Sequence, residues 1–377
     1  MPTPYSQADH RALHEALRAV IADGATPGGV ILTGAADGSR TVLAAGAVAP
    51  EHGPERPDEH TLYDLASLTK VVATWPLIGR AVEMGLLDID TPLREALPAM
   101  SDSTPSAEPT VRQILTHTSG MRATTRLDHY RGAELPLYEL MCREPLDDEP
   151  GRAHRYINRG FVLLGLALTH VHGRDLDQLA RELFDDLGMP ATTYGPLARS
   201  SRVAPTESRF PGAPQLWGTA HDDNAALLGG VAGHAGIFAS AHDLATYAER
   251  LLGAYANADD PLGAWFRAGL VPQAEIEPGL HRGLAWVTTH GGHTAYHHGF
   301  TGTSLYLAPA AGRYLVITTN AIHNGPARTR LAPLRALDSR CSPLDERGPG
   351  GWARGPCASA TGCIRQPGKR ANRSGSG

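Results

Sequence analysis

The stretch T-L-Y-D-L-A-S-L-T-K-V-V-A-T, residues 61–74, contains a serine and a lysine three residues apart, Ser67 and Lys70. If a helix begins at or just before Ser67, this spacing puts the hydroxyl and the amine on one helical face, one turn apart. A serine hydroxyl becomes an effective nucleophile when a neighbouring base takes its proton. The stretch therefore predicts a nucleophile beside its base.

Lysine usage points to the same position. The chain has 34 basic residues, of which only Lys70 and Lys369 are lysines. Arginine cannot lose its proton in a protein, whereas a lysine can. Because Ser-x-x-Lys patterns are common, chance retention of a surface lysine is the alternative interpretation. The bias toward arginine favours a base at Lys70.

Composition limits the class of protein. A length of 377 residues with 42% hydrophobic residues allows a large core, and a net charge of −5 with a pI near 6.4 argues against a nucleic-acid surface. The N-terminus shows no secretory signal, and the longest apolar run, 160–169, is too short to cross a membrane. We therefore expect a cytoplasmic protein without nucleic-acid or membrane partners. Reduced thiols are expected for Cys142, Cys341, Cys357 and Cys363.

Hydrophobic periodicity predicts strands at both ends of the chain and helices between them. The predicted fold class is α/β (α+β), with one antiparallel sheet built from N- and C-terminal segments, flanked by helices, and a large inserted helical region. Predicted helices cover 6–22, 110–116, 160–171, 176–187 and 241–252, together with one beginning at Ser67 and kinked by Pro76 near Val72. Predicted strands cover 30–33, 41–48, 283–288, 293–297, 302–307 and 314–319.

The same pattern predicts the domain organisation. Residues 1–76 and 265–337 form the sheet region, and residues 77–264 form the inserted helical region. Residues 338–377 are rich in Gly, Pro, Ser and Arg without periodicity, so we expect disorder there. The glycine-rich stretch 229–236 lacks the Gly-Lys-Ser/Thr ending of a phosphate-binding loop, and a tight loop is expected instead.

An acyl-transfer site built on serine also needs a proton donor for the leaving atom and donors for the oxyanion. Tyr156 and Asn158, in the pattern Tyr-x-Asn, offer a phenol and an amide. The segment H-H-G-F-T-G-T at 297–303 offers a backbone N–H near the end of a predicted strand. Taken singly, each signal is weak: a packed aromatic residue is the more common explanation of Tyr156, and Asn158 can be the N-cap of the helix 160–171.

Five blocks between residues 13 and 334 resemble, in order, those of the serine β-lactamase and penicillin-binding-protein superfamily. The resemblance is to the class C β-lactamase-like serine hydrolases and esterases. The blocks are D-L-A-S-L-T-K-V-V-A-T, V-R-Q-I-L-T-H-T-S-G-M, Y-I-N-R-G-F-V-L-L-G, H-D-D-N-A-A-L-L-G-G-V-A-G-H-A-G-I-F and H-G-F-T-G-T-S-L-Y-L-A-P.

The resemblance implies a role for each matching position and no cofactor or metal. Ser67 would be the acylated nucleophile with Lys70 as its base partner. Tyr156 would relay protons, and Asn158 would orient the substrate. The family's third motif, Lys/His-Thr/Ser-Gly, falls on His297, His298 and Gly299. The backbone N–H groups of Ser67 and Phe300 would form the oxyanion hole.

The third motif departs from the family pattern at its middle position. His298 replaces a small hydroxyl residue and is expected to narrow the pocket. His297 replaces a lysine, so a fixed charge for a substrate carboxylate is missing at that position. Both changes disfavour β-lactams and D-Ala-D-Ala peptides and favour neutral acyl donors.

The most favoured function is a cytoplasmic esterase or amidase that forms an acyl-Ser67 intermediate on a small neutral ester or amide. A transacylase that passes the acyl group to an amine or alcohol in a natural-product pathway is the first alternative. A non-catalytic binding relative, suggested by His298, is the second. A zinc enzyme is the third, because imidazoles are gathered at His290, His293, His297 and His298.

Overall fold

The computed structural model describes residues 5–100, 103–210, 212–289, 293–325 and 328–335. Its main sheet has eight antiparallel strands in the order β2-β1-β11-β10-β9-β8-β7-β6, and a second sheet has the order β3-β5-β4. The strands are β1 Gly28–Ala35, β2 Arg40–Gly46, β3 Tyr63–Asp64, β4 Thr193–Tyr194, β5 Ile237–Ala239, β6 Ala274–Glu277, β7 Leu280–Arg282, β8 Val287–Thr289, β9 Thr294–His298, β10 Ser304–Ala308 and β11 Arg313–Thr319.

The main sheet joins the two ends of the chain. Strand β1 pairs with β11 from Gly29 opposite Thr319 to Ala35 opposite Arg313. Every residue of β1 is buried, because strands flank it on both sides and helices cover both faces. The neighbouring edge strand β2 has only half-buried and exposed residues. The predicted fold class, with one antiparallel sheet assembled from both ends, is confirmed.

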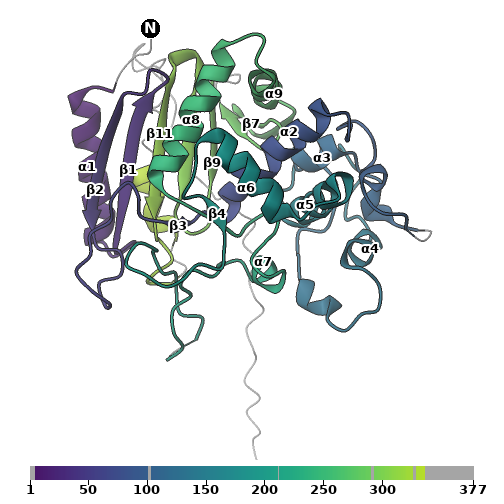
Figure 1. Ribbon diagram of the computed structural model, residues 1–377, viewed down its shortest axis with the longest axis horizontal. Helices are drawn as coiled ribbons and strands as arrows, with labels where there is room; N and C mark the ends of the chain where they lie inside the picture. The colour runs from purple at the N-terminus through teal and green to yellow at the C-terminus, as the bar shows by residue number, and fades with distance from the viewer. Residues whose placement is uncertain (1–4, 101–102, 211, 290–292, 326–327, 336–377) are drawn as a thin grey trace, which may run out of the picture.

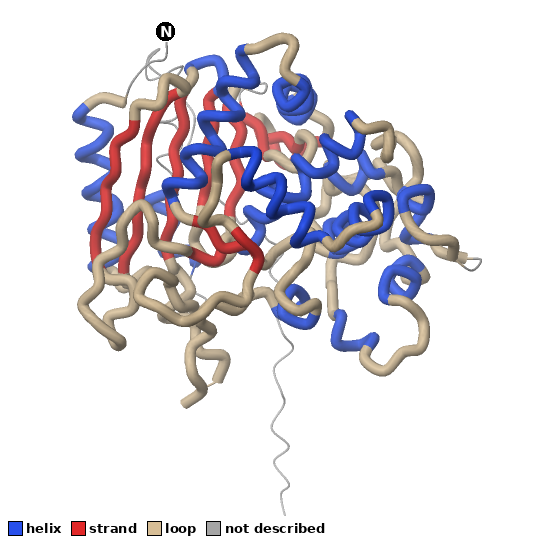
Figure 2. Tube along the Cα trace, in the orientation of Figure 1, coloured by secondary structure: helices blue, strands red, loops and turns tan. Residues whose placement is uncertain are grey.

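Helices cover the sheet and form the other half of the molecule (Figures 1 and 2). Helix α1 packs on one face of the sheet near α10, and α8 packs on β1 and β11 at the opposite face. The helices are α1 Gln7–Ala22, α2 Trp75–Glu83, α3 Val111–Leu115, α4 Leu137–Cys142, α5 Arg159–His172, α6 Leu176–Leu187, α7 Asp223–Leu227, α8 Ala241–Ala256, α9 Pro261–Leu270 and α10 Ala332–Arg335.

Local sequence signals explain several of the helix ends. Ser6 caps α1 with a capping box that includes Asp9. Thr110 and Gln113 form the same motif at α3. Helix α6 ends at Gly188, which has the left-handed conformation that glycine adopts readily. These predicted helices are confirmed.

The segment after Ser67 differs from the predicted kinked α-helix. A 3₁₀ turn at Ala66–Leu68 is followed by a π-helix at Lys70–Thr74 and then by α2. The Trp75 N–H donates to the Lys70 carbonyl, five residues earlier. Pro76 has no N–H to continue the α-helical pattern at this point. The proline therefore coincides with a change of helix type.

The predicted strand 283–288 is also wrong in its extent. Strand β7 ends at Arg282, and the chain turns before β8, with the Gly283 N–H donating to the Trp286 carbonyl at 2.9 Å. Strand β6, Ala274–Glu277, was not predicted. The three strands β6, β7 and β8 form the edge of the sheet beyond β9.

The domain boundaries drawn from the sequence remain predictions. Helix α8, which falls within the predicted insert, packs on β1 and β11. The predicted disordered tail, 338–377, lies outside the described residues. Among the described residues, no helix combines the length and apolarity needed to span a membrane.

Candidate active site

Ser67 and Lys70 lie in direct contact. The Lys70 Nζ donates to Ser67 Oγ at 2.9 Å and to the carbonyl of His234 at 3.3 Å. Lys70 is fully buried, and none of the described carboxylates forms an ion pair with it. Ser67 is half-buried. The predicted spacing therefore brings the hydroxyl and the amine together, although through a 3₁₀ turn and a π-helix.

The backbone before Ser67 is held in an uncommon conformation. Ala66 has φ of 45°, in the left-handed region that non-glycine residues rarely adopt. Its N–H donates to the Asp64 carboxylate at 2.8 Å, and that carboxylate also accepts the His221 N–H at 2.7 Å. Burial raises the pKa of Asp64. Such strain persists where surrounding contacts enforce it, and it is often found at functional sites.

Tyr156 lies on the other side of Lys70. The lysine Nζ is 5.1 Å from the centre of the Tyr156 ring. The ring centres of His117 and His297 lie 4.4 Å and 6.2 Å from that of Tyr156. Three of the predicted site residues, Ser67, Lys70 and Tyr156, thus come together from segments almost ninety positions apart in the chain.

Asn158 precedes helix α5 but does not cap it with its side chain. Its Oδ1 is buried without a hydrogen-bond partner among the described residues. A buried amide oxygen that lacks a partner is costly. The arrangement leaves this group available for a ligand, as the interpretation of Asn158 as a substrate-orienting amide requires.

The turn after β9 is attached to the segment that carries the nucleophile. The Thr301 hydroxyl donates to the Asp64 carbonyl at 2.5 Å, and the Thr303 hydroxyl donates to the Leu65 carbonyl at 3.1 Å. A Cβ at Gly299 would collide with the Leu65 carbonyl, so only glycine fits this close approach. The turn brings the backbone of Phe300 to the region of Ser67. Its role as an oxyanion donor remains a prediction.

The side chains of His297 and His298 lie on opposite faces of strand β9. His297 lies near Tyr156 with its Nε2 buried and without a partner among the described residues. His298 packs against Tyr296 and Tyr306 on the other face, and its Nδ1 lies 2.9 Å from Ser304 Oγ. Successive side chains of a strand point to opposite faces. The prediction that His298 narrows the pocket is therefore wrong.

The sequence analysis missed a group of cationic and imidazole side chains around Tyr156. The Arg282 Cζ is 5.7 Å from the centre of the Tyr156 ring. Burial, with the nearby charge of Arg282, lowers the pKa of His117 and of His297 well below the usual value, and that of His154 to about 4. These imidazoles are neutral near pH 7. His117 belongs to a motif block that we had quoted, but Arg282 belongs to none.

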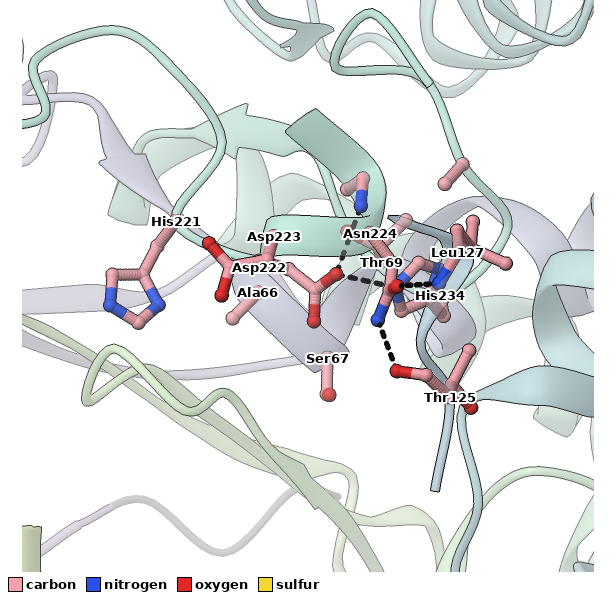
Figure 3. A network of polar contacts seen from close by, with 12 residues as sticks. Ala66, Ser67, Thr69, Thr125, Leu127, His221, Asp222, Asp223, Asn224 and His234 are labelled. Atoms are coloured by element: carbon pink, nitrogen blue, oxygen red, sulfur yellow. Dashed lines mark hydrogen bonds and ion pairs between the residues drawn. The ribbon is translucent and has the colours of Figure 1, made fainter. Parts of the chain in front are cut away.

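A contact between Asp222 and His234 supports the loop beneath Lys70. His234 Nε2 lies 2.8 Å from Asp222 Oδ1, and the pKa of Asp222 is lowered by His234 and Lys70 despite its burial. Figure 3 shows this pair close to Ser67, with Asn224 linking α7 to Thr125 and Leu127. The H-D-D-N and G-H-A-G sequences of the fourth motif block thus meet at the site.

The arrangement does not support the zinc alternative. Within the described ranges, no group of three or more His, Cys, Asp or Glu side chains is placed to hold a metal ion. His297 and His298 lie on opposite faces of β9, and His293 is exposed. His290 lies outside the described residues.

Comparison with known proteins agrees with this geometry. Residues 13–339 match the sequence model of the Beta-lactamase family. A protein of Salmonella typhimurium, named as a D-alanyl-D-alanine carboxypeptidase, is 27% identical, and the match covers 74% of each chain.

Two solved structures show the same fold. A β-lactamase/D-alanine carboxypeptidase of Pseudomonas syringae has a TM-score of 0.72 and 18% identity, and the match covers 91% of this chain and all of that one. EstCE1, described as a hydrolase with promiscuous acyltransferase activity, has a TM-score of 0.67 and 22% identity and covers 88% of this chain and all of its own. The family match covers most of the chain and contains the Ser67–Lys70 contact. The chain belongs to the Beta-lactamase family of serine acyl-transfer hydrolases.

Proposed function

We propose that this protein is a serine esterase or amidase that acts on a small neutral ester or amide through an acyl-Ser67 intermediate. The observation that carries the proposal is the 2.9 Å contact between Lys70 Nζ and Ser67 Oγ, with Lys70 buried and facing the Tyr156 ring. A cytoplasmic location is part of the proposal and rests on the sequence alone.

In the proposed reaction, Ser67 Oγ attacks the acyl carbonyl carbon while the neutral Lys70 amine takes the hydroxyl proton. The Tyr156 hydroxyl gives its proton to the departing alkoxide or amine as the bond to the acyl carbon breaks. The resulting phenolate then recovers a proton from the Lys70 ammonium. Water attacks the acyl-Ser67 ester in the second half, with the same groups moving the proton.

The choice of a neutral acyl donor rests on position 297. In the family motif this position carries a lysine or histidine, and here it is His297, which is kept neutral by burial. Among the described residues, two arginines also lie near the site: Arg282, which donates to His154 and Ala285, and Arg335, which donates to the Gly299 carbonyl. The preference for a neutral donor therefore rests on the neutral imidazole of His297.

Acyl transfer to an amine or alcohol remains the alternative. The argument for it from His298 no longer holds, because that side chain lies on the far face of β9. The same correction removes the argument for a non-catalytic relative. The similarity to EstCE1, a hydrolase that also transfers acyl groups, supports acyl transfer and hydrolysis to the same degree.

Intact mass spectrometry after exposure to a fluorophosphonate tests the nucleophile before any natural substrate is known. We expect one covalent addition on the wild type and none on Ser67→Ala. Ser119→Ala is a matched control, because Ser119 lies in another of the motif blocks and is buried, and no lysine hydrogen-bonds to it. Labelling of Ser67→Ala to the wild-type extent would disprove the proposal.

A further inference from the structure

Arg282 is a buried cation without a counter-ion among the described residues. It ends strand β7 and is 2% exposed. Its Nε donates to His154 Nε2 at 3.4 Å, and one terminal nitrogen donates to the Ala285 carbonyl at 3.0 Å. Both partners are neutral. Burial lowers the pKa of Arg282 to about 10, and the only groups that favour its charged form are the phenols of Tyr156 and Tyr296.

Burying a charge without an opposite charge is costly, and such a charge usually has a function. The guanidinium carbon lies 5.7 Å from the centre of the Tyr156 ring, and Lys70 Nζ lies 5.1 Å from the same centre. Two cations from different elements therefore face one phenol. No carboxylate among the described residues forms an ion pair with either cation, although Asp222 lies close enough to feel the charge of Lys70.

Three imidazoles lie around Tyr156 and Arg282. His117, which follows α3, and His297, on β9, have their rings near that of Tyr156, whereas His154 contacts His117 and Arg282. All three have lowered pKa values, because burial and the charge of Arg282 oppose a further positive charge. Arg282 therefore contributes a lasting positive charge near Tyr156 at neutral pH. Arg282 supplies the charge that a lysine at position 297 would have carried on β9.

We propose that Arg282 is a positioning residue that stabilises the anionic form of Tyr156 during proton relay. The inference rests on the proposed function, in which Tyr156 becomes a phenolate when it protonates the leaving group and remains so until Lys70 returns a proton. Arg282 holds its charge throughout, whereas the charge of Lys70 changes during each cycle. Each proton is conserved, passing from Ser67 to Lys70, from Tyr156 to the leaving group, and from Lys70 to Tyr156.

Binding of a substrate carboxylate is the competing role for the same cation. It is compatible with the geometry, because Nε and one terminal nitrogen donate to His154 and Ala285 while the guanidinium has three further N–H groups. The guanidinium is held by the β7–β8 turn and faces the phenol ring. A test must therefore separate an effect on proton transfer from an effect on substrate charge.

The test compares Arg282→Met and Arg282→Lys with the wild type on three esters. Phenyl butyrate and monophenyl succinate are similar in size, but only the second has a carboxylate. Both release phenol, which departs poorly without a proton. The p-nitrophenyl ester of butyrate releases a group that departs without one. Arg174→Met is the control, since Arg174 is exposed and paired with Glu182 far from the site chemistry.

We expect Arg282→Met to lower kcat about tenfold or more for both phenyl esters alike, with KM nearly unchanged and a smaller loss on the p-nitrophenyl ester. Arg282→Lys should keep most of the activity near pH 7 and lose it at alkaline pH as the buried amine gives up its charge. The wild type should not show this alkaline loss in the same range, and Arg174→Met should match the wild type.

Three results would overturn the inference. A loss confined to monophenyl succinate would assign Arg282 to carboxylate binding. Unchanged kcat in Arg282→Met, or an Arg282→Lys variant with the wild-type pH profile, would remove the electrostatic role. If Arg282→Met does not fold, the Arg282→Lys profile decides alone. Absence of fluorophosphonate labelling in the wild type would instead disprove the proposed function, so the two failures are distinguishable.

Discussion

His297 and His298 are consecutive in the chain, yet their imidazoles lie on opposite faces of β9. His297 lies near the Tyr156 ring, and His298 contacts Ser304 and the rings of Tyr296 and Tyr306. A motif aligned by position assigns both residues to the site. The alternation of a strand allows only one of them to face it.

His298→Thr should therefore leave the ratio of hydrolysis to aminolysis unchanged at a fixed amine concentration. It should lower the free energy of unfolding by about 0.5–3 kcal/mol, because an aromatic contact and a hydrogen bond are lost. Product analysis and urea denaturation measure the two effects. A changed ratio in a variant of wild-type stability would mean that His298 reaches the acyl-enzyme.

The nucleophile and its neighbours could be predicted because they lie in short local patterns. Ser67 and Lys70 are three residues apart, and Tyr156 and Asn158 are two apart. The sheet could be predicted because β-branched runs occur at both ends of the chain, and β1 indeed pairs with β11. Each of these signals is contained within a few residues of sequence.

Arg282 could not be predicted, because nothing in its own sequence surroundings distinguishes it from the other arginines. Its position beside Tyr156 results from the pairing of β7 with β8 and from a distant loop that brings Tyr156 close to it. The π-helix at Lys70–Thr74 could not be predicted either, because Pro76 is the one residue in the sequence that indicated an irregular helix there. Strand β6, A-E-I-E, has one large apolar residue between two glutamates, so its sequence does not stand out from a polar loop.

Replacing Lys70 tests the identity of the base. Lys70→Arg keeps the positive charge but cannot accept a proton, so acylation should fall by orders of magnitude. Because Lys70 is fully buried, the larger guanidinium also costs about 1–3 kcal/mol of stability. Lys70→Met, which removes the charge without added bulk, controls for that strain and should be equally slow. An active Lys70→Arg enzyme would make Tyr156 or another group the base.

The Asp222–His234 pair should act through the position of Lys70. Asp222→Asn weakens the contact with the fully buried His234, whose carbonyl accepts a hydrogen bond from Lys70 Nζ. We expect a stability loss of about 1–3 kcal/mol and slower fluorophosphonate labelling. Asp223→Asn is the adjacent control, because Asp223 is exposed and pairs with Arg209. Equal labelling rates in Asp222→Asn and Asp223→Asn would show that the pair does not position Lys70.

Buried neutral histidines make stability depend on pH. Burial lowers the pKa values of His117, His154, His297 and His298 in the folded state, whereas in the unfolded chain each titrates near ~6.5. Below about pH 6.5 the unfolded state therefore binds more protons than the folded state, so stability is lost as the pH falls. For His154 the loss continues down to its folded pKa of about 4.

Urea denaturation between pH 7.5 and 5 should show this decline, with a plateau above about pH 7. Each such histidine adds up to about 1.4 kcal/mol per pH unit to the slope. His154→Gln should have a shallower slope than the wild type over this window, whereas His170→Gln, an exposed position on α5, should keep the wild-type slope. The range stops at pH 5 because paired carboxylates contribute below it. Parallel slopes for His154→Gln and the wild type would show that His154 titrates normally in the folded protein.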